Sequence, residues 1–184
     1  MLFCLVRFGL KPRIATERSD AGEPRVSKIL DLIRASRYSV HDLSRCQAQS
    51  RGEYYRLNMP FELGLDFGCR HYGNGRLSSK VILVLEEKRY RYQATISDLA
   101  GSDIEAHGGD YQLAVRKVRN WLVGMPGFEA IGAARVLADY EDFQEWNFER
   151  QRNLGSSEED IKDYSTADLL KAMVDWRESR SEAP

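Results

Sequence analysis

The sequence feature that most constrains the fold is a short apolar run, residues 81–85, with Lys80 before it and Glu86 after it. A strand covered by helices on both faces has this continuous apolar pattern, whereas a strand with one solvent face alternates apolar and polar residues. Such strands occur in parallel sheets, whose connections are crossovers that usually contain a helix. The run therefore predicts an α/β fold with a parallel sheet.

The rest of the chain alternates between helical and extended patterns. Val26, Ile29 and Ile33 recur at helical spacing and predict an amphipathic helix that begins near Pro24. The other elements that we expect are helices at 1–9 (ending at Gly9), 59–71 and from Asp110 onward, and strands at 13–16 and 38–43. This order predicts right-handed crossovers, with helices on both faces of the sheet.

The length and the charge distribution suggest one domain with an appendage. The chain has 184 residues and a formal net charge of -1, so it lacks the basic excess typical of nucleic-acid-binding proteins. Residues 134–184 carry 7 basic and 13 acidic side chains, whereas residues 1–133 carry 20 basic and 15 acidic ones. We expect an α/β domain at 1–125 and an acidic helical C-terminal extension at 126–184, packed on that domain. Ser156 and Glu159 have the capping-box spacing that begins a short helix.

The sequence also bears on localisation and cofactors. No apolar run approaches the ~20 residues that a membrane span needs, and the first residues lack the features of a signal peptide. Cys4, Cys46 and Cys69 are odd in number and have no metal-ligand spacing, which suits a reducing cytoplasm. We expect a cytoplasmic protein without membrane association and without a metal or prosthetic group.

Polar residues that could form a site follow one strand and begin the next helix. Ligands bind beyond the carboxyl ends of the strands in an open parallel sheet. Asp42, Ser44 and Arg45 lie at such an end, and Asn58 and Glu62 lie near the start of the helix at 59–71. A helix N-terminus favours an ionised carboxylate, which is the form that attacks a sugar anomeric carbon. We expect Glu62 in the first turn of its helix, beside a crevice shared with Asp42 and Arg45.

Each of these residues also has a structural interpretation. Glu62 could satisfy backbone amides at the start of its helix, and Asp42 and Ser44 could cap a turn. Arg45 could be a solvated surface residue, and we expect His41 to be structural because it has no evident partner.

The polar segment at 86–110 is long and irregular, which is typical of a functional or mobile segment. Tyr90 and Tyr92 could stack on a base, and Asp98 is a further candidate for substrate binding. We expect this segment to form a lid or wall over the crevice.

Two weaker patterns occur in the same segment. Asp98, Asp103 and His107 could bind a metal, but their spacing matches no strong template. Residues 89–93 alternate basic and aromatic side chains, as in some proteins that bind single strands, although a half-exposed edge is the commoner structure.

The run MPFELGL at 59–65, after a strand that ends in an acidic residue, resembles nucleoside deoxyribosyltransferases. In that family a Glu-Leu-Gly or Glu-Ile-Gly helix start carries the glutamate that attacks the sugar. TIR domains are similar in layout, with a flavodoxin-like fold and one glutamate on the corresponding helix, and they cleave the N-glycosidic bond of NAD. A wider set of motifs resembles a bacterial group of uncharacterised TIR-like proteins. These motifs are Arg25 with Lys28 and Ile29, and the segments 36–38, 41–45, 58–64, 90–93 and 97–103.

The resemblance covers roughly residues 1–125 and implies a flavodoxin-like sheet and an N-glycosidase that acts on a nucleotide or NAD. Glu62 would attack or stabilise C1′ of a ribosyl group. Asp42 and Asn58 would hold the sugar hydroxyls or the base, and Arg45 would hold a phosphate. NAD or the nucleotide would be a substrate and not a prosthetic group. A nucleotide sensor without turnover and a protein–protein interaction module are the alternative functions.

The sequence departs from that group at its start. The group normally begins with a further strand and an Asn-Cys-Pro-Phe-like turn, which do not precede the first expected helix here. That strand would be central, and each backbone group left buried and unpaired costs about 1–3 kcal/mol. The sheet could be re-ordered, a second copy could supply an edge in a homodimer, or Met1 could be internal to a longer protein. We favour the first two.

Overall fold

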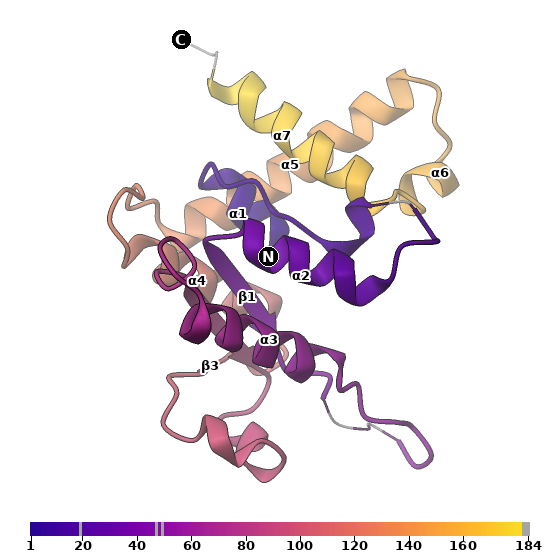
Figure 1. Cartoon of the computed structure of the whole chain (residues 1–184). Coiled ribbons are helices and arrows are strands. Elements are labelled where there is room, and N and C mark those ends of the chain that lie inside the picture. The colour runs from indigo at the N-terminus through magenta and orange to yellow at the C-terminus, as the bar shows by residue number, and fades with distance from the viewer. Residues whose placement is uncertain (19, 47, 49, 182–184) are drawn as a thin grey trace. The chain divides into compact units, whose positions relative to one another are not determined.

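The computed structural model describes residues 1–18, 20–46, 48 and 50–181, which form seven α-helices and a three-stranded sheet (Figure 1). The last three residues of the expected extension, 182–184, lie outside the described residues. The elements are α1 Leu2–Arg7, α2 Arg25–Ala35, β1 Tyr38–Asp42, α3 Asn58–Tyr72, β2 Val81–Glu86, β3 Glu105–Ala106, α4 Tyr111–Val123, α5 Ala133–Asn153, α6 Glu158–Lys162 and α7 Thr166–Ser181. Three short 3-10 helices are η1 Ala15–Glu17, η2 Arg91–Ala94 and η3 Ser97–Leu99.

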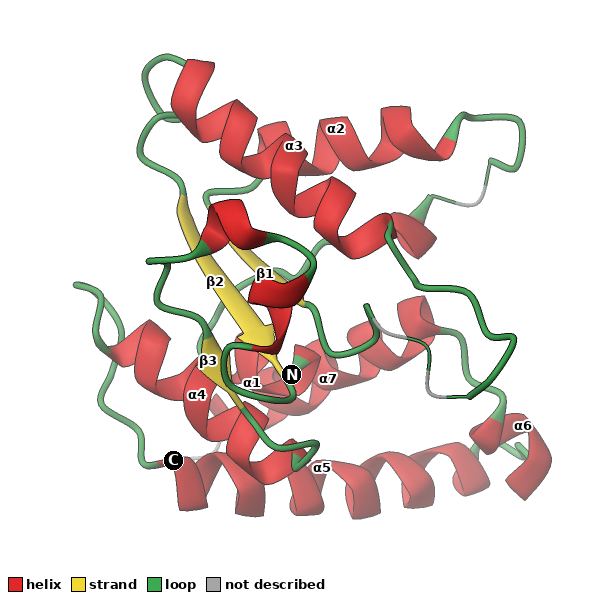
Figure 2. Cartoon of the chain, turned by 90° about the horizontal axis from the view of Figure 1, so that it is seen from below, coloured by secondary structure: helices red, strands yellow, loops and turns green. Residues whose placement is uncertain are grey.

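The sheet is parallel and has the order β1-β2-β3. The apolar run at 81–85 forms a strand, as predicted, and the structure places that strand at the centre. β1 pairs with β2 from Tyr38 opposite Val81 to Asp42 opposite Leu85. Helices α2 and α3 lie side by side on one face of this sheet (Figure 2). The α/β class with a small parallel sheet is thus confirmed.

The sheet of the described residues has no vacant position. β1 lies directly beside β2, and the short strand β3 lies on the other side of β2. The order therefore removes the unpaired backbone groups that a missing central strand would create. This order is compatible with the re-ordered alternative, and the homodimer and the longer protein stay predictions.

The predicted strand at 13–16 is wrong, because Ala15–Glu17 form the 3-10 helix η1. The β-branched residues Ile14 and Thr16 favour an extended chain. Arg13 Nε, however, donates a hydrogen bond to Glu17 Oε1 at 2.6 Å, across four positions. This local side-chain pair is compatible with a helical turn and not with a strand.

The unit at residues 20–117 has its own core. Its buried side chains come from the loop after β1, from α3, from β2 and from η2, and they are Leu43, Cys46, Leu63, Val84 and Tyr92. The core therefore ties the loop after β1 and the segment after β2 to the sheet.

A buried ionic cluster supports the same unit. Lys80 Nζ lies 3.2 Å from Asp66 Oδ1 and also donates to the carbonyl oxygens of Ile33 at 2.7 Å and Ser36 at 2.5 Å. His41 Nε2 lies 3.0 Å from the other Asp66 oxygen, Oδ2. The lysine thus satisfies two carbonyls at the C-terminal end of α2 while its charge is balanced by Asp66. His41 has a structural environment, as expected.

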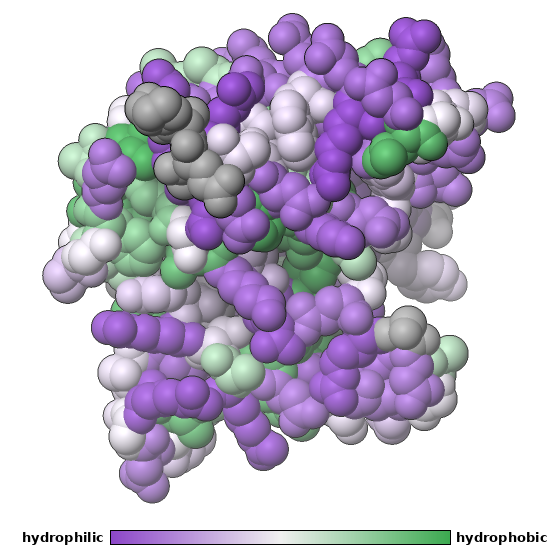
Figure 3. Space-filling model, turned by 90° about the horizontal axis from the view of Figure 1, so that it is seen from above, coloured by the Kyte–Doolittle hydropathy of each residue, from purple (hydrophilic) through white to green (hydrophobic). Residues whose placement is uncertain are grey.

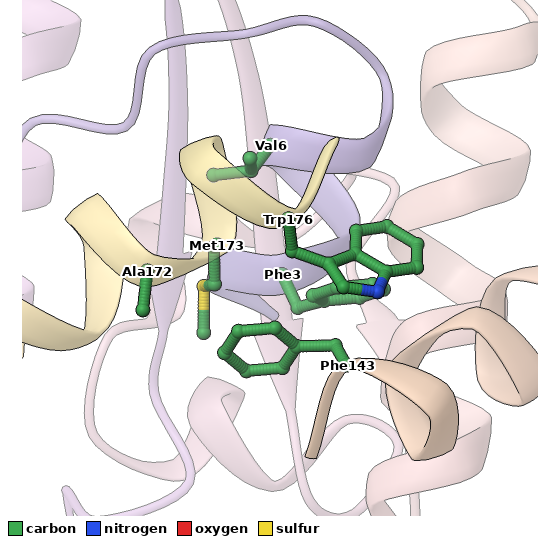
Figure 4. Close-up of a cluster of buried hydrophobic side chains, with 6 residues drawn as sticks. All are labelled: Phe3, Val6, Phe143, Ala172, Met173 and Trp176. Carbon is green, nitrogen blue, oxygen red and sulfur yellow. The ribbon is translucent and has the colours of Figure 1, made fainter. Parts of the chain in front are cut away.

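The second unit combines the described residues of 1–19 with those of 118–184. Its core contains six buried side chains from α1, α5 and α7, namely Phe3, Val6, Phe143, Ala172, Met173 and Trp176 (Figure 4). The Phe3 ring centroid lies 5.3 Å from that of Phe143 and 5.2 Å from that of Trp176. These aromatic contacts join α1 to the C-terminal helices, and the expected domains at 1–125 and 126–184 stay a prediction.

The expected helix at 1–9 is present as α1, and Gly9 follows it with φ +79°, the left-handed conformation that glycine adopts without strain. The capping box of α6 lies one residue later than predicted. Ser157 accepts a hydrogen bond from Asp160 N, and Asp160 Oδ2 accepts one from Ser157 N, so aspartate replaces the expected glutamate.

The face drawn in Figure 3 is mostly hydrophilic, with small apolar patches. Within the described residues, no helix has both the length and the apolar character that crossing a membrane requires.

Candidate functional site

The carboxyl ends of the three strands bring polar side chains to one edge of the sheet. Asp42 ends β1, Glu86 ends β2, and His107 directly follows β3. His107 N donates to the Glu86 carbonyl at 2.9 Å, which continues the β2–β3 pairing by one residue. This edge is where open parallel sheets bind ligands.

Asp42, Ser44 and His107 are joined by hydrogen bonds, and we call them the edge cluster. Asp42 Oδ1 accepts from Ser44 N at 3.0 Å and from Ser44 Oγ at 2.5 Å. Ser44 Oγ lies 2.8 Å from His107 Nε2, and that nitrogen lies 3.5 Å from Asp42 Oδ1. The sequence predicted Asp42 and Ser44 as candidate site residues. The fold brings His107, 63 positions from Ser44, into contact with them.

A backbone contact orients the proton of neutral His107. Gly109 N–H donates to His107 Nδ1 at 3.2 Å, so Nδ1 is an acceptor and Nε2 carries the hydrogen. Gly108 and Gly109 make this turn with φ +63° and +77°, a conformation that side chains with a Cβ rarely adopt.

The direction of these hydrogen bonds limits the chemistry of the edge cluster. His107 Nε2–H donates to Ser44 Oγ, and the Ser44 hydroxyl donates to Asp42. A serine nucleophile needs a histidine that accepts its proton, which is the opposite arrangement. The edge cluster therefore presents an oriented carboxylate, suited to accepting hydrogen bonds from the hydroxyl groups of a ligand.

Arg91 connects the ends of β1 and β2. It forms an ion pair with the buried Glu86, donates to Glu87 Oε2 at 3.0 Å and donates to the Ser44 carbonyl at 2.8 Å. Because a guanidinium has five donors in a rigid plane, one side chain can hold the two segments together. Arg91 thereby fixes the backbone of Ser44, on which the edge cluster depends.

Cys46 lies close to the same edge but does not provide a reactive thiolate. Burial raises the pKa of its thiol to about 11, and the nearby carboxylates of Glu86 and Asp42 act in the same direction. The thiol is therefore protonated at neutral pH, and its role is packing in the core.

Glu62 has a different position from the one predicted. Helix α3 begins at Asn58, so Glu62 is its fifth residue, beyond the first turn. Pro60 is the third residue, where the missing N–H costs nothing because first-turn amides have no partner within the helix. Glu62 Oε1 lies 3.7 Å from a terminal nitrogen of Arg25, the first residue of α2. A crevice shared by Glu62 with Asp42 and Arg45 stays a prediction.

The other predicted site residues differ in exposure. Arg45, Asn58 and Asp98 are exposed, and Tyr90 is 58% exposed with the Arg89 guanidinium 5.0 Å from its ring centroid. Tyr92 is 4% exposed and packs in the core. Stacking of Tyr92 on a base would require this core to open.

The metal interpretation of Asp98, Asp103 and His107 has no support in the described part of the chain. There, no group of three or more His, Cys, Asp or Glu side chains is arranged to hold a metal ion.

Sequence reasoning missed the structural importance of Asp66, Lys80 and Arg91. One signal was present for the first two, because Asp66 interrupts an apolar helix face and Lys80 directly precedes an apolar strand. A buried charge at such positions indicates a partner of opposite charge.

Comparison of the chain with protein-family models, with curated proteins and with solved structures found no match. The candidate site therefore rests on the geometry of its own residues.

Proposed function

We propose that the chain binds a nucleoside or nucleotide at the carboxyl edge of its sheet and cleaves the N-glycosidic bond of that ligand. The observation that carries the proposal is the edge cluster, in which residues after two strands present one oriented carboxylate. The parallel sheet is compatible with a flavodoxin-like arrangement, the fold in which the resembling enzymes bind their substrates at this edge.

In this proposal each residue contacts a different part of the substrate. Asp42 accepts hydrogen bonds from ribosyl hydroxyls, and Asn58 contacts the sugar or the base. The exposed Arg45 pairs with a phosphate, while Tyr90 and Asp98 approach the base from the segment after β2. α3 follows β1 and leads by a crossover to parallel β2, so its N-terminal half lies toward the carboxyl edge. That topology supports a role for Glu62.

The reaction needs only water as the second substrate. The bond between C1′ and the base nitrogen breaks, and the leaving base takes the electron pair. A neutral base also takes up one proton of the water, whereas the cationic nicotinamide of NAD leaves as a neutral base and that proton goes to the solvent. Glu62 stabilises the positive charge at C1′ or bonds to it, and the oxygen of water ends on C1′.

Nucleotide sensing without turnover is the second candidate. The position of Glu62 favours it, because this carboxylate is paired with Arg25 of α2, whereas the edge cluster is already joined internally. A nucleotide bound at the edge cluster would then raise the melting temperature of the protein, and the nucleotide would stay uncleaved.

Mass spectrometry of the protein incubated with NAD, nucleosides and nucleotides tests the enzyme. We expect release of a free base, and we expect Glu62→Gln to abolish it, because an amide keeps the shape but lacks the anionic charge. Glu149→Gln removes the same charge from an exposed position of α5 and serves as the matched control.

The other outcomes separate the candidates. A near-normal rate in Glu62→Gln would make Glu62 structural. A melting shift with a nucleotide that Asp42→Asn removes, without any product, would favour the sensor. Neither product nor shift with any of these ligands would overturn both candidates.

A further inference from the structure

A pocket of about 490 Å³ lies among α1, α5 and α7, within the unit that contains the termini of the described chain. Small-molecule sites commonly have this size. The charged residues that line it are Arg7, Arg135, Arg177, Arg180, Asp139 and Asp142. The lining therefore carries a formal surplus of two positive charges, although residues 134–184 as a whole are acidic.

One buried carboxylate fixes two of the arginines. Arg7 Nε donates to Asp139 Oδ2 at 2.6 Å, and Arg135 Nε donates to Asp139 Oδ1 at 2.7 Å. Asp139 is almost completely buried, with 8% of its side chain exposed. Both hydrogen bonds use Nε, so within the described residues the terminal amino groups of the two guanidiniums remain as donors for a further acceptor.

A second carboxylate fixes the other side of the pocket. Asp142 accepts from Trp176 Nε1 at 2.8 Å, and its two oxygens accept from Arg180 Nη2 at 2.8 and 2.7 Å. Burial tends to raise the pKa of Asp142, but the hydrogen bonds from Trp176 and Arg180 outweigh it and lower that pKa. Asp142 is thus ionised near neutral pH, and Arg180 is held in place. Arg177 Nη1 donates to the Val6 carbonyl at 3.2 Å.

We propose that this pocket binds the phosphate group of a small molecule. A guanidinium donates two parallel hydrogen bonds to phosphate oxygens, and its planar geometry suits this ligand better than an ammonium does. A phosphate monoester carries a charge of about -1.5 to -2 at pH 7, which matches the surplus on the lining. Arg135 and Arg180 are 70% and 52% exposed in their side chains, so a ligand can reach them.

This ligand site is separate from the edge cluster, which belongs to the other unit. The proposal does not depend on the proposed glycosidase, because none of the residues that line the pocket comes from residues 20–117.

Isothermal titration of the full chain with inorganic phosphate, pyrophosphate and ADP, at constant ionic strength, tests the proposal. We expect saturable binding that Arg135→Gln or Arg180→Gln weakens by about tenfold or more, the usual effect of losing hydrogen bonds to a charged group. Arg152→Gln is the matched control, because Arg152 is exposed on the same helix as Arg135 but does not line the pocket. It should change Kd by less than about twofold, since exposed charges away from a site are screened by salt.

Comparable loss of phosphate and ADP binding in the pocket variants would identify the phosphate group as the element recognised. Binding of inorganic phosphate or pyrophosphate that these variants leave unchanged would place the anion elsewhere and overturn the proposal. An equal loss in Arg152→Gln, or no saturable heat with any probe, would also overturn it.

Asp139→Asn separates a built site from simple charge attraction. The change makes the lining more positive but releases Arg7 and Arg135. Weaker pyrophosphate binding in a variant that still melts cooperatively supports the site. Tighter binding would mean that charge alone attracts the anion, and would contradict the proposal.

Discussion

At the scale of single residues, two tyrosines two positions apart have opposite environments. Tyr90 has φ +66°, unusual for a non-glycine residue, and is 58% exposed. Tyr92 is 4% exposed and packs with Leu43, Cys46 and Leu63. Identical residue types at this spacing therefore give no basis for assigning both to ligand stacking.

We predict that Tyr92→Ala lowers the free energy of unfolding by about 3–5 kcal/mol, the usual cost of removing a buried aromatic ring. Tyr90→Gly should change it by less than about 1 kcal/mol, because relief of the left-handed conformation offsets the added chain entropy of glycine. Urea denaturation followed by circular dichroism measures both values. Equal effects of the two changes would contradict the assigned environments.

The environment of Asp66 predicts that this residue stabilises the folded protein at neutral pH and no longer does so in acid. Burial raises its pKa, but the hydrogen bond with His41 and the charge of Lys80 outweigh this and hold the pKa below its usual value. A carboxyl with a lowered folded-state pKa stabilises the protein above its unfolded-state pKa of about 3.9. That contribution to stability is lost as the pH falls through the lower pKa of Asp66 in the folded protein.

We therefore expect Asp66→Asn to cost about 3–5 kcal/mol at pH 7, because it leaves the Lys80 ammonium buried without its carboxylate. The difference from the wild type should narrow below about pH 4, because Asp66 takes up a proton there in the unfolded chain while its folded-state pKa is lower. Urea denaturation at pH 7 and pH 3 checks this, with the exposed Asp103→Asn as control. A difference that is the same at both pH values would show that the charge of Asp66 is unimportant.

At the scale of elements, residues 94–103 of the segment after β2 are hydrogen-bonded in local turns, whereas Tyr92 anchors the start of the segment in the core. Ile96 N donates to the Tyr92 carbonyl at 2.7 Å, and Ala100 N donates to the Ser97 carbonyl at 2.8 Å. Such bonds break by local opening, whereas the bonds of β2 require disruption of the sheet. The expected irregular segment is therefore largely present, although it contains η2, η3 and the short strand β3.

We predict that amides of residues 94–103 exchange with deuterium faster than those of 81–85 in the free protein. A nucleotide at the edge cluster should slow exchange in 94–103, if this segment covers the ligand. Hydrogen exchange with mass spectrometry, with and without ADP, makes the comparison. Exchange as slow in 94–103 as in β2 without a ligand would argue against a lid.

At the scale of the whole molecule, the two ends of the described chain belong to one unit. Arg177 of α7 donates to the Val6 carbonyl of α1 across 171 positions, and Phe3 stacks on Phe143 of α5. The N-terminal helix is therefore part of the same core as the C-terminal helices.

Phe3→Ala should destabilise the unit of the terminal helices by about 3–5 kcal/mol, since Phe3 is 4% exposed. Limited proteolysis should then cut α5 and α7 before it cuts residues 20–117. Leu154→Ala is the control, because Leu154 is 70% exposed. Cleavage that begins in 20–117 would show that α1 is not required by the C-terminal helices.

The sequence by itself determined the α/β class, the strand β2, the helices α2 and α3, and the glycine that ends α1. These features follow from local backbone geometry, which imposes a repeat of 3.6 residues on a helix and of 2 on a strand, and from the continuous apolar pattern of a strand covered on both faces. The local pair of Arg13 and Glu17 overrode the β-branched pattern beside it.

Only the tertiary structure decided the contacts between segments distant in the sequence. It joined His107 to Ser44 and paired Glu62 with Arg25. It also brought Lys80 to Asp66 and to the C-terminal end of α2, and it packed α1 against α5 and α7. A pattern shows that a side chain needs burial or a partner, but the choice among possible partners depends on the free energy of packing all elements together. The candidate site consists of such choices, so the sequence indicated its edge of the sheet and two of its three joined residues.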